Sequence, residues 1–487
     1  MEKTLKGLNK RKFLKIIIFL FAFLFFFIIK CFNYDRYPLM GHLEEYAYSW
    51  MGIHLLTSGV PQTWSPGERP HPSQDIAFSG KISNYGVDLY VDILAPWLDL
   101  PPLYGILSGG TAFFFGADKW LVLPASYIRL PAIIFSFLTT LVLFFLVKKL
   151  FGYWMALLAV TFYSLTPLFV FSQRLSVAEN GIALLYLTSI WLTLIYIEKR
   201  KGCLLGLVPI LIGLAGLMKQ TGFLIVFLII FLLVREKLWK ESLFVFFGVL
   251  WFFGFLLMYG WSVNLEIFKE VTLNQSKRPV GFLGLPFLFS TAGYSIDFFY
   301  DGWYVFSLIA AIYYSLTKFR EKNYQIISLG FIFWAMVVVF SGGQADVLLW
   351  YRYPFFSFLA IFGALMLVEI AKKPNLFTSI LVVGMLLTGR VFLSNEFRPL
   401  TEPFRFRIIV AFLLLPIICF HLFDKPIFEK LAKLVIVGVI IVGLFFNTQA
   451  IYSAFPIASA SKTFPMGPTT VLSEVHLPII WRLFLVE

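Results

Sequence analysis

Charged residues are scarce in this chain of 487 residues. Asp, Glu, Lys and Arg together make up 14% of the sequence, whereas soluble domains average about 25%. Hydrophobic residues account for 59%, and the mean hydropathy is +0.83. This composition excludes a soluble enzyme and is typical of a polytopic membrane protein.

Cysteine is also rare. The chain has three cysteines, Cys31, Cys203 and Cys419, which lie far apart in or beside apolar segments. Their spacing fits neither a metal site nor an evident disulfide. The cysteines therefore give no information about the redox compartment of the protein.

Acidic residues are fewer than basic ones, 27 against 40, so the formal charge is +13. A strongly basic chain can bind nucleic acid. Here, however, the basic residues lie in short connections between apolar segments, as the positive-inside rule requires of cytoplasmic loops. The charge therefore indicates orientation in the membrane, and we expect no nucleic-acid partner.

Long apolar segments predict an all-α fold with about thirteen transmembrane helices, because about 20 apolar residues cross a bilayer. The first span, at about 13–29, follows five basic residues and has a sixth, Lys15, near its start, so we expect an uncleaved signal anchor and a cytoplasmic N-terminus. The further spans are predicted at about 128–147, 153–171, 181–197, 203–218, 221–234, 243–262, 302–317, 325–341, 350–370, 376–392, 407–422 and 432–447.

The connections between these spans support the predicted topology. Every second connection is basic, although 390–407 carries four arginines on a side predicted to be outside. The odd number of spans places the C-terminal tail outside as well. We therefore divide the chain into a transmembrane domain, 1–447, and a short extracytoplasmic tail, 448–487. The expected location is the plasma membrane, with membrane lipids around a multi-pass protein.

The first outer connection, 31–125, is unusually acidic. Between Cys31 and Leu100 it holds eight acidic residues and three basic ones. Glu44 and Glu45 fall in the first turn of a predicted helix that Gly59 ends. The Trp and Tyr residues of this helix suit the headgroup region, so we expect helices in the plane of the membrane. The helix dipole alone would explain the position of the two acids. A functional role for them is therefore indicated only by other charged residues of the chain.

Those other charges stand at the outer ends of predicted spans, where an isolated charge is costly. Snorkelling to the interface accounts for any one of them alone. Together they would form a cluster that can hold a phosphate leaving group beside a general base. Its acids are Glu44, Glu45, Asp99 and Glu179, and its bases are Arg129, Arg174, Lys219 and Arg352.

The order of these motifs resembles the GT-C glycosyltransferases, specifically those related to protein O-mannosyltransferases and the lipid A aminoarabinose transferase. The resemblance covers about residues 10–370. It is carried by EEYAY at 44–48, DLPPLY at 99–104, IRLP at 128–131, SQRLSVAEN at 172–180, GLMKQTG at 216–222 and YRYP at 351–354. The first acid is Glu where the family usually has Asp, and Leu100 stands where relatives often have His or Lys.

The resemblance implies a GT-C type membrane glycosyltransferase. Such an enzyme moves a sugar from a polyprenyl-phosphate donor to a hydroxyl of a glycan, lipid or protein acceptor on the extracytoplasmic side, here with inversion. Carried onto this chain, it gives Glu44 the place of the catalytic or metal-linked acid and Asp99 that of a metal ligand. It gives Glu179 the place of the second outer acid.

The remaining predicted roles concern the phosphate and the base. The resemblance assigns Lys219 and Arg352 to the donor phosphate, and the charge cluster adds Arg129 and Arg174. Glu45 remains an alternative to Glu44 as the base, because adjacent carboxylates can divide the roles of base and metal ligand. A divalent metal ion is the expected cofactor, held by Asp99 and Glu44.

A flippase or transporter of lipid-linked sugars is the alternative. It would also need outer charges and about a dozen spans, but is expected to carry polar residues at the bilayer midplane and internal repeats. The spans here have few midplane charges and no visible repeat, which favours the enzyme. A non-catalytic scaffold would give the acid-rich connection no role.

Overall fold

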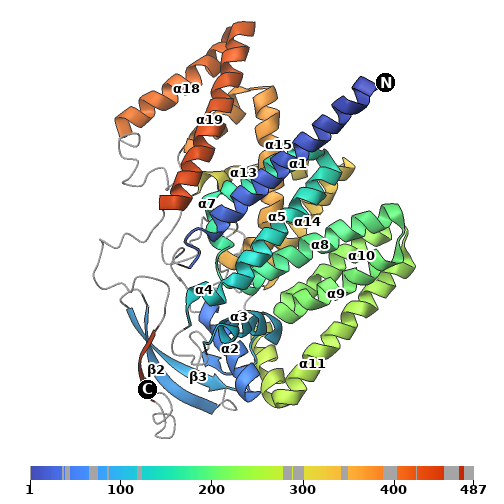
Figure 1. The fold of residues 1–487 in the computed structure, drawn as a ribbon, viewed down its shortest axis with the longest axis vertical. Coiled ribbons are helices and arrows are strands. Elements are labelled where there is room, and N and C mark those ends of the chain that lie inside the picture. The colour runs from blue at the N-terminus through green and yellow to red at the C-terminus, as the bar shows by residue number, and fades with distance from the viewer. Residues whose placement is uncertain are drawn as a thin grey trace.

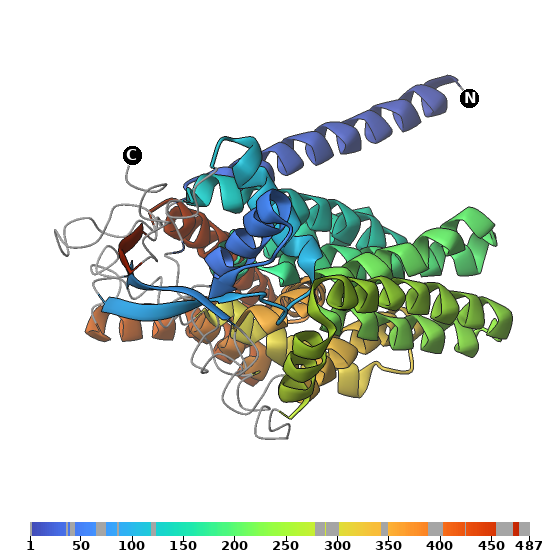
Figure 2. The ribbon, with the colours of Figure 1, turned by 90° about the horizontal axis from the view of Figure 1, so that it is seen from below.

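The structure is a computed structural model of a helical bundle with a small sheet at one end (Figures 1 and 2). It describes residues 2–35, 38, 44–64, 75–84, 87–117, 123–277, 288, 301–341, 349–387, 403–423, 425–453 and 471–476.

Each predicted span corresponds to one or two helices, and only 388–392 of the span at 376–392 lie outside the described residues. These helices are α1 (Glu2–Cys31), α4 (Ala125–Ile128), α5 (Leu130–Phe151), α6 (Tyr153–Leu165), α7 (Pro167–Ser172), α8 (Ala178–Lys199), α9 (Gly202–Met218), η1 (Gln220–Leu224), α10 (Ile225–Arg235), α11 (Trp239–Ser276), α13 (Gly302–Thr317), α14 (Lys322–Ser341), η3 (Leu349–Arg352), α15 (Tyr353–Lys372), α16 (Leu376–Leu387), α18 (Pro403–Phe423) and α19 (Pro426–Ser453).

Seven of the described helices are long and apolar enough to cross a membrane, and six shorter apolar helices have 10–17 residues. The predicted helical membrane fold is therefore confirmed, whereas the count of thirteen spans is not. One reason that the count differs is the span predicted at 153–171, which is divided into two shorter helices, α6 and α7, at Pro167. Proline lacks an N–H group and suits the first position of a new helix.

The helix α15 forms the centre of the bundle. Every residue from Tyr353 to Leu367 is buried. Helices at the periphery instead expose large apolar side chains, such as Phe21 on α1 and Trp251 on α11, which are 70% and 71% exposed. This arrangement suits a bundle whose outer surface contacts lipid.

The first outer connection forms α2 (Glu44–Ser58) and α3 (Pro102–Phe114), which pack closely against each other. A Cβ atom added to Gly52 on α2 would lie 1.8 Å from the carbonyl oxygen of Gly105 on α3. Only glycine therefore permits this approach of the two backbones. The helix α2 ends as predicted at Gly59, whose φ is +72°.

The prediction that α2 presents its aromatic residues to lipid headgroups is wrong for Tyr46, Tyr48 and Trp50. All three side chains are fully buried within the protein. The cause is the contact with α3 and the bundle, which removes from solvent the face that the sequence pattern assigned to the interface. The helix is held by protein contacts and is part of the core.

A four-stranded antiparallel sheet was not predicted in this connection. Its strands are β1 (Thr63–Trp64), β2 (Asp75–Asn84), β3 (Val87–Ala95) and β4 (Val471–His476), in the order β1-β3-β2-β4. The alternating apolar residues of β3 are typical of a strand. The strand β4 comes from the C-terminal tail, whose residues 454–470 and 477–487 lie outside the described residues.

The sheet, α2 and α3 lie at the end of the bundle opposite the N-terminus (Figure 1). The acidic connection and the described strand of the tail thus meet at one end of the molecule. The site residues described below are attached to this end.

Candidate active site

A buried ion pair joins Glu179 and Lys219. The Nζ atom of Lys219 donates a hydrogen bond to Oε1 of Glu179 at 2.5 Å, and the side chains are only 9% (Lys219) and 2% (Glu179) exposed. The ammonium of Lys219 also lies 4.0 Å from the centroid of the Tyr351 ring, a cation–π contact. Three elements of the fold, α8, the end of α9 and η3, therefore meet at this pair.

Local structure explains the positions of these two residues. Glu179 is in the first turn of α8, where the helix dipole favours a negative charge. Lys219 lies between α9 and η1 with extended backbone angles, φ −157° and ψ 139°. The chain turns tightly here, because a Cβ atom on Gly222 would lie 2.3 Å from the carbonyl oxygen of Ala215. The glycines of GLMKQTG thus serve the geometry that presents Lys219.

Glu44 and Tyr48 lie near this ion pair on α2. Burial raises the pKa of Tyr48 well above its ordinary value, and the negative charges of Glu179 and Glu44 raise it further. Burial lowers the pKa of Lys219, but the charges of Glu179, Tyr351 and Glu44 outweigh burial, so the net pKa is raised. The two carboxylates therefore share one electrostatic environment with Lys219.

Both Tyr48 and Glu179 have a buried polar atom without a hydrogen-bond partner among the described residues. These atoms are the hydroxyl oxygen of Tyr48 and Oε2 of Glu179. Buried polar atoms are nearly always paired, because an unpaired one costs about 1–3 kcal/mol. Two such atoms near one another are typical of a site that a ligand completes.

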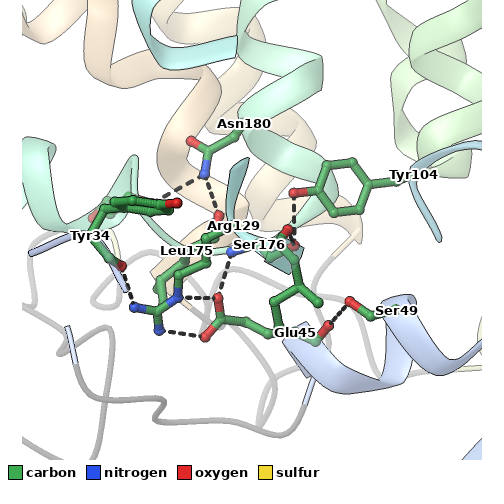
Figure 3. Close-up of polar contacts among 10 residues, drawn as sticks. Tyr34, Glu45, Ser49, Tyr104, Arg129, Leu175, Ser176 and Asn180 are labelled. Carbon is green, nitrogen blue, oxygen red and sulfur yellow. Dashed lines mark hydrogen bonds and ion pairs between the residues drawn. The ribbon is translucent and has the colours of Figure 1, made fainter. Parts of the chain in front are cut away.

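A second buried ion pair, Glu45–Arg129, has a different geometry (Figure 3). Arg129 donates from Nε to Oε1 of Glu45 at 2.9 Å and from Nη2 to Oε2 at 2.8 Å. Its Nη1 donates to the carbonyl oxygen of Tyr34 at 2.9 Å. The backbone N–H of Ser176 donates to Oε1 of Glu45 at 2.6 Å. Both oxygens of Glu45 and all three nitrogens of the guanidinium are thus engaged.

Tyr104 on α3 lies close enough to both pairs to be affected by their charges. Its hydroxyl lies 3.3 Å from Oγ of Ser176, which in turn donates to the carbonyl oxygen of Ile128 at 2.6 Å. Burial raises the pKa of Tyr104, and the charges of both Glu45 and Glu179 act in the same direction. The two ion pairs are therefore neighbours in one polar region.

Arg174, in the segment between α7 and α8, contacts the C-terminal end of α1. Its Nη2 donates to the carbonyl oxygen of Ile29 at 2.7 Å, and its Nε donates to that of Lys30 at 3.2 Å. A positive charge at this end of a helix is favoured by the helix dipole. Lys30, which was not predicted, is fully buried and donates hydrogen bonds to Ser136 and Gln173. These contacts attach α1 to the segment that precedes Glu179.

Arg352 is fully buried at the start of α15, directly after Tyr351. Its Nη1 lies 3.4 Å from the hydroxyl of Tyr304 on α13. Asp301, also not predicted, caps α13 and accepts a hydrogen bond from the N–H of Leu168 on α7 at 2.9 Å. Burial raises the pKa of Asp301 to about 6. An Asp directly before a helix is an N-cap signal that the sequence did offer.

Asp99 is half-buried in the connection between β3 and α3. Its carbonyl oxygen accepts hydrogen bonds from Nε2 of Gln220 at 3.1 Å and from Nε2 of Gln275 at 2.7 Å. No group of three or more His, Cys, Asp or Glu residues that could hold a metal occurs in the part of the chain that the structure describes.

The structure therefore brings some of the eight predicted site residues together and separates others. Glu44, Glu179 and Lys219 form one cluster, and Glu45 and Arg129 form a saturated pair beside it. Asp99 is connected to the cluster through Gln220, the residue after Lys219. Tyr48 and Tyr351 were not predicted, although Tyr48 is four residues after Glu44 on one helix face and Tyr351 precedes Arg352.

The fold and these contacts define a multi-pass membrane protein with a buried acid–base cluster. Residues 100–261 match the family model for the dolichyl-phosphate-mannose-protein mannosyltransferases. The match includes Arg129, Glu179 and Lys219, and it confirms over these residues the predicted resemblance. The prediction of a membrane glycosyltransferase that uses a lipid-phosphate sugar agrees with the description of this family model.

Several solved structures are similar to the chain. ArnT from Cupriavidus metallidurans bound to undecaprenyl phosphate is 14% identical over 90% of this chain and 76% of its own, with a TM-score of 0.48. The oligosaccharyltransferase AglB from Archaeoglobus fulgidus, with an inhibitory peptide and a dolichol-phosphate, is 12% identical over 92% of this chain and 57% of its own, with a TM-score of 0.47. An A. fulgidus oligosaccharyltransferase complex with Zn and sulfate is 14% identical over 85% of this chain and 53% of its own, with a TM-score of 0.42. No curated protein matches the chain.

Proposed function

We propose that this protein transfers a sugar from a polyprenyl-phosphate donor to an acceptor hydroxyl, with inversion at the sugar carbon. The observation that carries this proposal is the cluster of Glu44, Tyr48, Glu179 and Lys219, in which a carboxylate lies near a fixed cation. The hydroxyl of Tyr48 and Oε2 of Glu179 in this cluster have no hydrogen-bond partner among the described residues. Transfer from a phosphate donor needs both groups, one to accept a proton and one to stabilise the phosphate that leaves.

In the proposed reaction Glu44 is the general base. It accepts the proton of the acceptor hydroxyl while the hydroxyl oxygen forms a bond to the anomeric carbon of the sugar. The bond between that carbon and the donor phosphate oxygen breaks, and the phosphate leaves with the electron pair. Lys219 and Arg352 stabilise the charge that develops on this phosphate. Attack opposite the leaving group inverts the configuration.

Glu179 has a supporting place in this scheme. It holds Lys219 through Oε1, and its Oε2 is buried without a hydrogen-bond partner among the described residues. We propose that Glu179 orients the Lys219 ammonium and interacts with the bound substrate through Oε2. This keeps the predicted acid in the reaction centre and leaves proton transfer to Glu44.

The contacts of Glu45, Arg129 and Arg174 favour positioning roles over the predicted catalytic and phosphate-binding ones. Arg129 would have to leave Glu45 in order to bind a phosphate, and breaking a buried ion pair costs about 3–5 kcal/mol. Arg174 is engaged with the end of α1. In this proposal the three residues hold α1, α2 and the segment before α8 around the cluster.

The predicted divalent ion would be held by Glu44 and Asp99. No group of three or more His, Cys, Asp or Glu residues that could hold a metal occurs among the described residues, so further ligands would include phosphate oxygens and water, as is usual for Mg²⁺. When bound, such an ion would supply positive charge at the donor phosphate. The proposed proton transfer to Glu44 and the stabilisation by Lys219 and Arg352 do not depend on it.

The donor can be identified with purified protein in detergent and a panel of polyprenyl-phosphate sugars, each radiolabelled in the sugar. We expect one donor to lose its sugar to an acceptor and to leave polyprenyl phosphate. Reconstituted vesicles distinguish the alternative of a flippase. Movement of intact lipid-linked sugar across the vesicle membrane without cleavage of the sugar–phosphate bond would contradict the proposal.

The proposed orientation places the N-terminus and the basic connections in the cytoplasm of a plasma-membrane protein. Residues 31–125 and the tail would face outside, which agrees with the pairing of β4 from the tail with β2. A cysteine introduced at position 75 should react with an impermeant reagent on intact cells. Reaction only after permeabilisation would reverse the orientation.

A further inference from the structure

The carbonyl oxygen of Asp99 is held by two glutamines from separate elements. Nε2 of Gln275 donates to it at 2.7 Å, and Nε2 of Gln220 donates to it at 3.1 Å. One carbonyl oxygen has two lone pairs, so the two amides use its full accepting capacity. Neither glutamine had a predicted role, and Gln275 lies outside the residues that match the family model.

Gln275 reaches this place because α11 changes direction. Asn264 interrupts the helix with φ −168° and ψ 107°, and its Oδ1 accepts a hydrogen bond from the N–H of Ile267 at 3.1 Å. This is the contact of a helix N-cap, so the residues that follow form a second helical segment. Ile267, Phe268 and Val271 of that segment belong to one apolar cluster with Leu98. Packing and hydrogen bonding therefore fix Leu98 and Asp99 together.

Gln220 connects Asp99 to the reaction centre. Gln220 follows Lys219 directly, and the side chain of Lys219 donates a hydrogen bond to Glu179. Lys219 has extended backbone angles, in which successive side chains point to opposite sides. One dipeptide thus holds Glu179 through its first residue and the backbone of Asp99 through its second.

We propose that Gln220 and Gln275 are positioning residues that set the place of Asp99 relative to the Glu179–Lys219 pair. This inference rests on the proposed function, in which Asp99 would help to hold a divalent ion at the donor phosphate. The two amides contact only the protein. They act by keeping the Asp99 carboxylate within reach of the site, and small misplacements of such groups are costly for catalysis.

The first test removes the amides one at a time and together. Gln220→Ala and Gln275→Ala should each lower kcat/KM about 3–10-fold, and the double variant about 10–100-fold, since each neutral hydrogen bond contributes modestly. Hydrogen exchange of the peptide that contains Asp99 and Leu100 should become faster in the same order. The matched control is Gln325→Ala, which removes an amide paired with Arg235 on other helices and should leave both measurements unchanged.

The second test uses Gln275→Glu, which keeps the size of the side chain. An ionised carboxylate cannot donate to the Asp99 carbonyl oxygen, whereas a protonated one can. The activity of this variant relative to wild type should therefore recover as the pH falls toward about 4–5, where a glutamate side chain gains its proton. The Gln275→Ala variant should show no such recovery, and a purely structural role would not produce this difference.

Two outcomes separate this inference from the proposed function. If Asp99→Asn is inactive while the double glutamine variant keeps wild-type kcat/KM, the inference is wrong and the role of Asp99 stands. A double variant with a lower unfolding temperature but unchanged kcat/KM per folded molecule would overturn it equally. If Asp99→Asn is fully active, the proposed role of Asp99 is wrong and the inference falls with it.

Discussion

The two buried ion pairs beside α2 have the same chemistry but different completeness. In Glu45–Arg129 both carboxylate oxygens and three guanidinium nitrogens are engaged. In Glu179–Lys219 one carboxylate oxygen has no hydrogen-bond partner among the described residues, and the hydroxyl of Tyr48 nearby has none either. A saturated buried pair holds structure together, whereas an incomplete one has capacity left for a ligand. Charge and burial alone would not have distinguished the two pairs.

The largest effect is expected from Glu44→Gln, the base near the incomplete pair. The amide keeps the shape of the side chain but cannot take the proton of the acceptor, so the transfer rate should fall about 10²–10⁴-fold. Folding and donor binding should stay near wild type, as measured by unfolding temperature and by binding of the radiolabelled donor. The control is Glu266→Gln, an exposed glutamate on α11.

Glu45→Gln completes that experiment, because adjacent carboxylates can exchange roles. If only Glu45→Gln loses the chemical step, the base is Glu45. If both single variants and the double variant turn over at the wild-type rate, the acidic connection is not catalytic.

Arg129→Met should give the largest loss of stability. It leaves the Glu45 carboxylate buried without its cation, which is expected to lower the free energy of unfolding by about 3–5 kcal/mol. Denaturant unfolding in detergent measures this change. Arg200→Met is the matched control, since Arg200 is half exposed and lies 4.0 Å from Glu241. Equal losses in the two variants would remove the distinction between a structural pair and a surface pair.

Lys219→Met should affect both donor binding and turnover. A lysine beside a phosphate stabilises the ground state and the transition state, so we expect KM to rise and kcat to fall. The combined loss in kcat/KM should be about 10–100-fold, the size of one charged hydrogen bond. Lys433→Met, which removes an exposed Lys–Glu pair on α19, serves as the control. An unchanged KM for the donor would argue against contact with the phosphate.

A smaller effect is expected from Gly52→Ala in the contact between α2 and α3. The added methyl group would meet the backbone of Gly105, and overpacking of this kind costs about 1–3 kcal/mol. Gly110→Ala on α3 is the matched control, because its Cβ would meet only Cδ1 of Leu56 at 3.3 Å. The unfolding temperatures should separate the two variants. A Gly52→Ala protein as stable as Gly110→Ala would show that the two helices do not need this close approach.

The sequence predicted the helical fold well because long apolar segments and basic connections are local signals. The span predicted as one helix at 153–171 is divided into two helices at Pro167. The burial of Trp50 could not be predicted from the sequence. A membrane interface and a protein interior select the same aromatic residues, so composition does not distinguish them. The strand β4 pairs with β2 across most of the chain length, and no local pattern specifies such a partner.

The sequence offered candidate site residues but not their arrangement. Glu179 and Lys219 became candidates as charges at span ends, where a charge needs a reason, and Glu44 became one as part of the acidic outer connection. The sequence could not show that Arg129 binds Glu45, because that pairing depends on how α2 docks against α4 and α5. The same holds for Gln220 and Gln275, which are neutral residues with no motif of their own.

The central claim is tested most directly by making one substitution in both pairs, Glu179→Gln and Glu45→Gln. The measurement is the single-turnover rate per folded molecule at saturating donor, together with the unfolding temperature of each variant. We predict that Glu179→Gln lowers the rate strongly, and that Glu45→Gln mainly lowers the unfolding temperature while its folded molecules transfer sugar at close to the wild-type rate. A Glu45→Gln protein that is stable but inactive, beside a Glu179→Gln protein with the wild-type rate, would contradict the account.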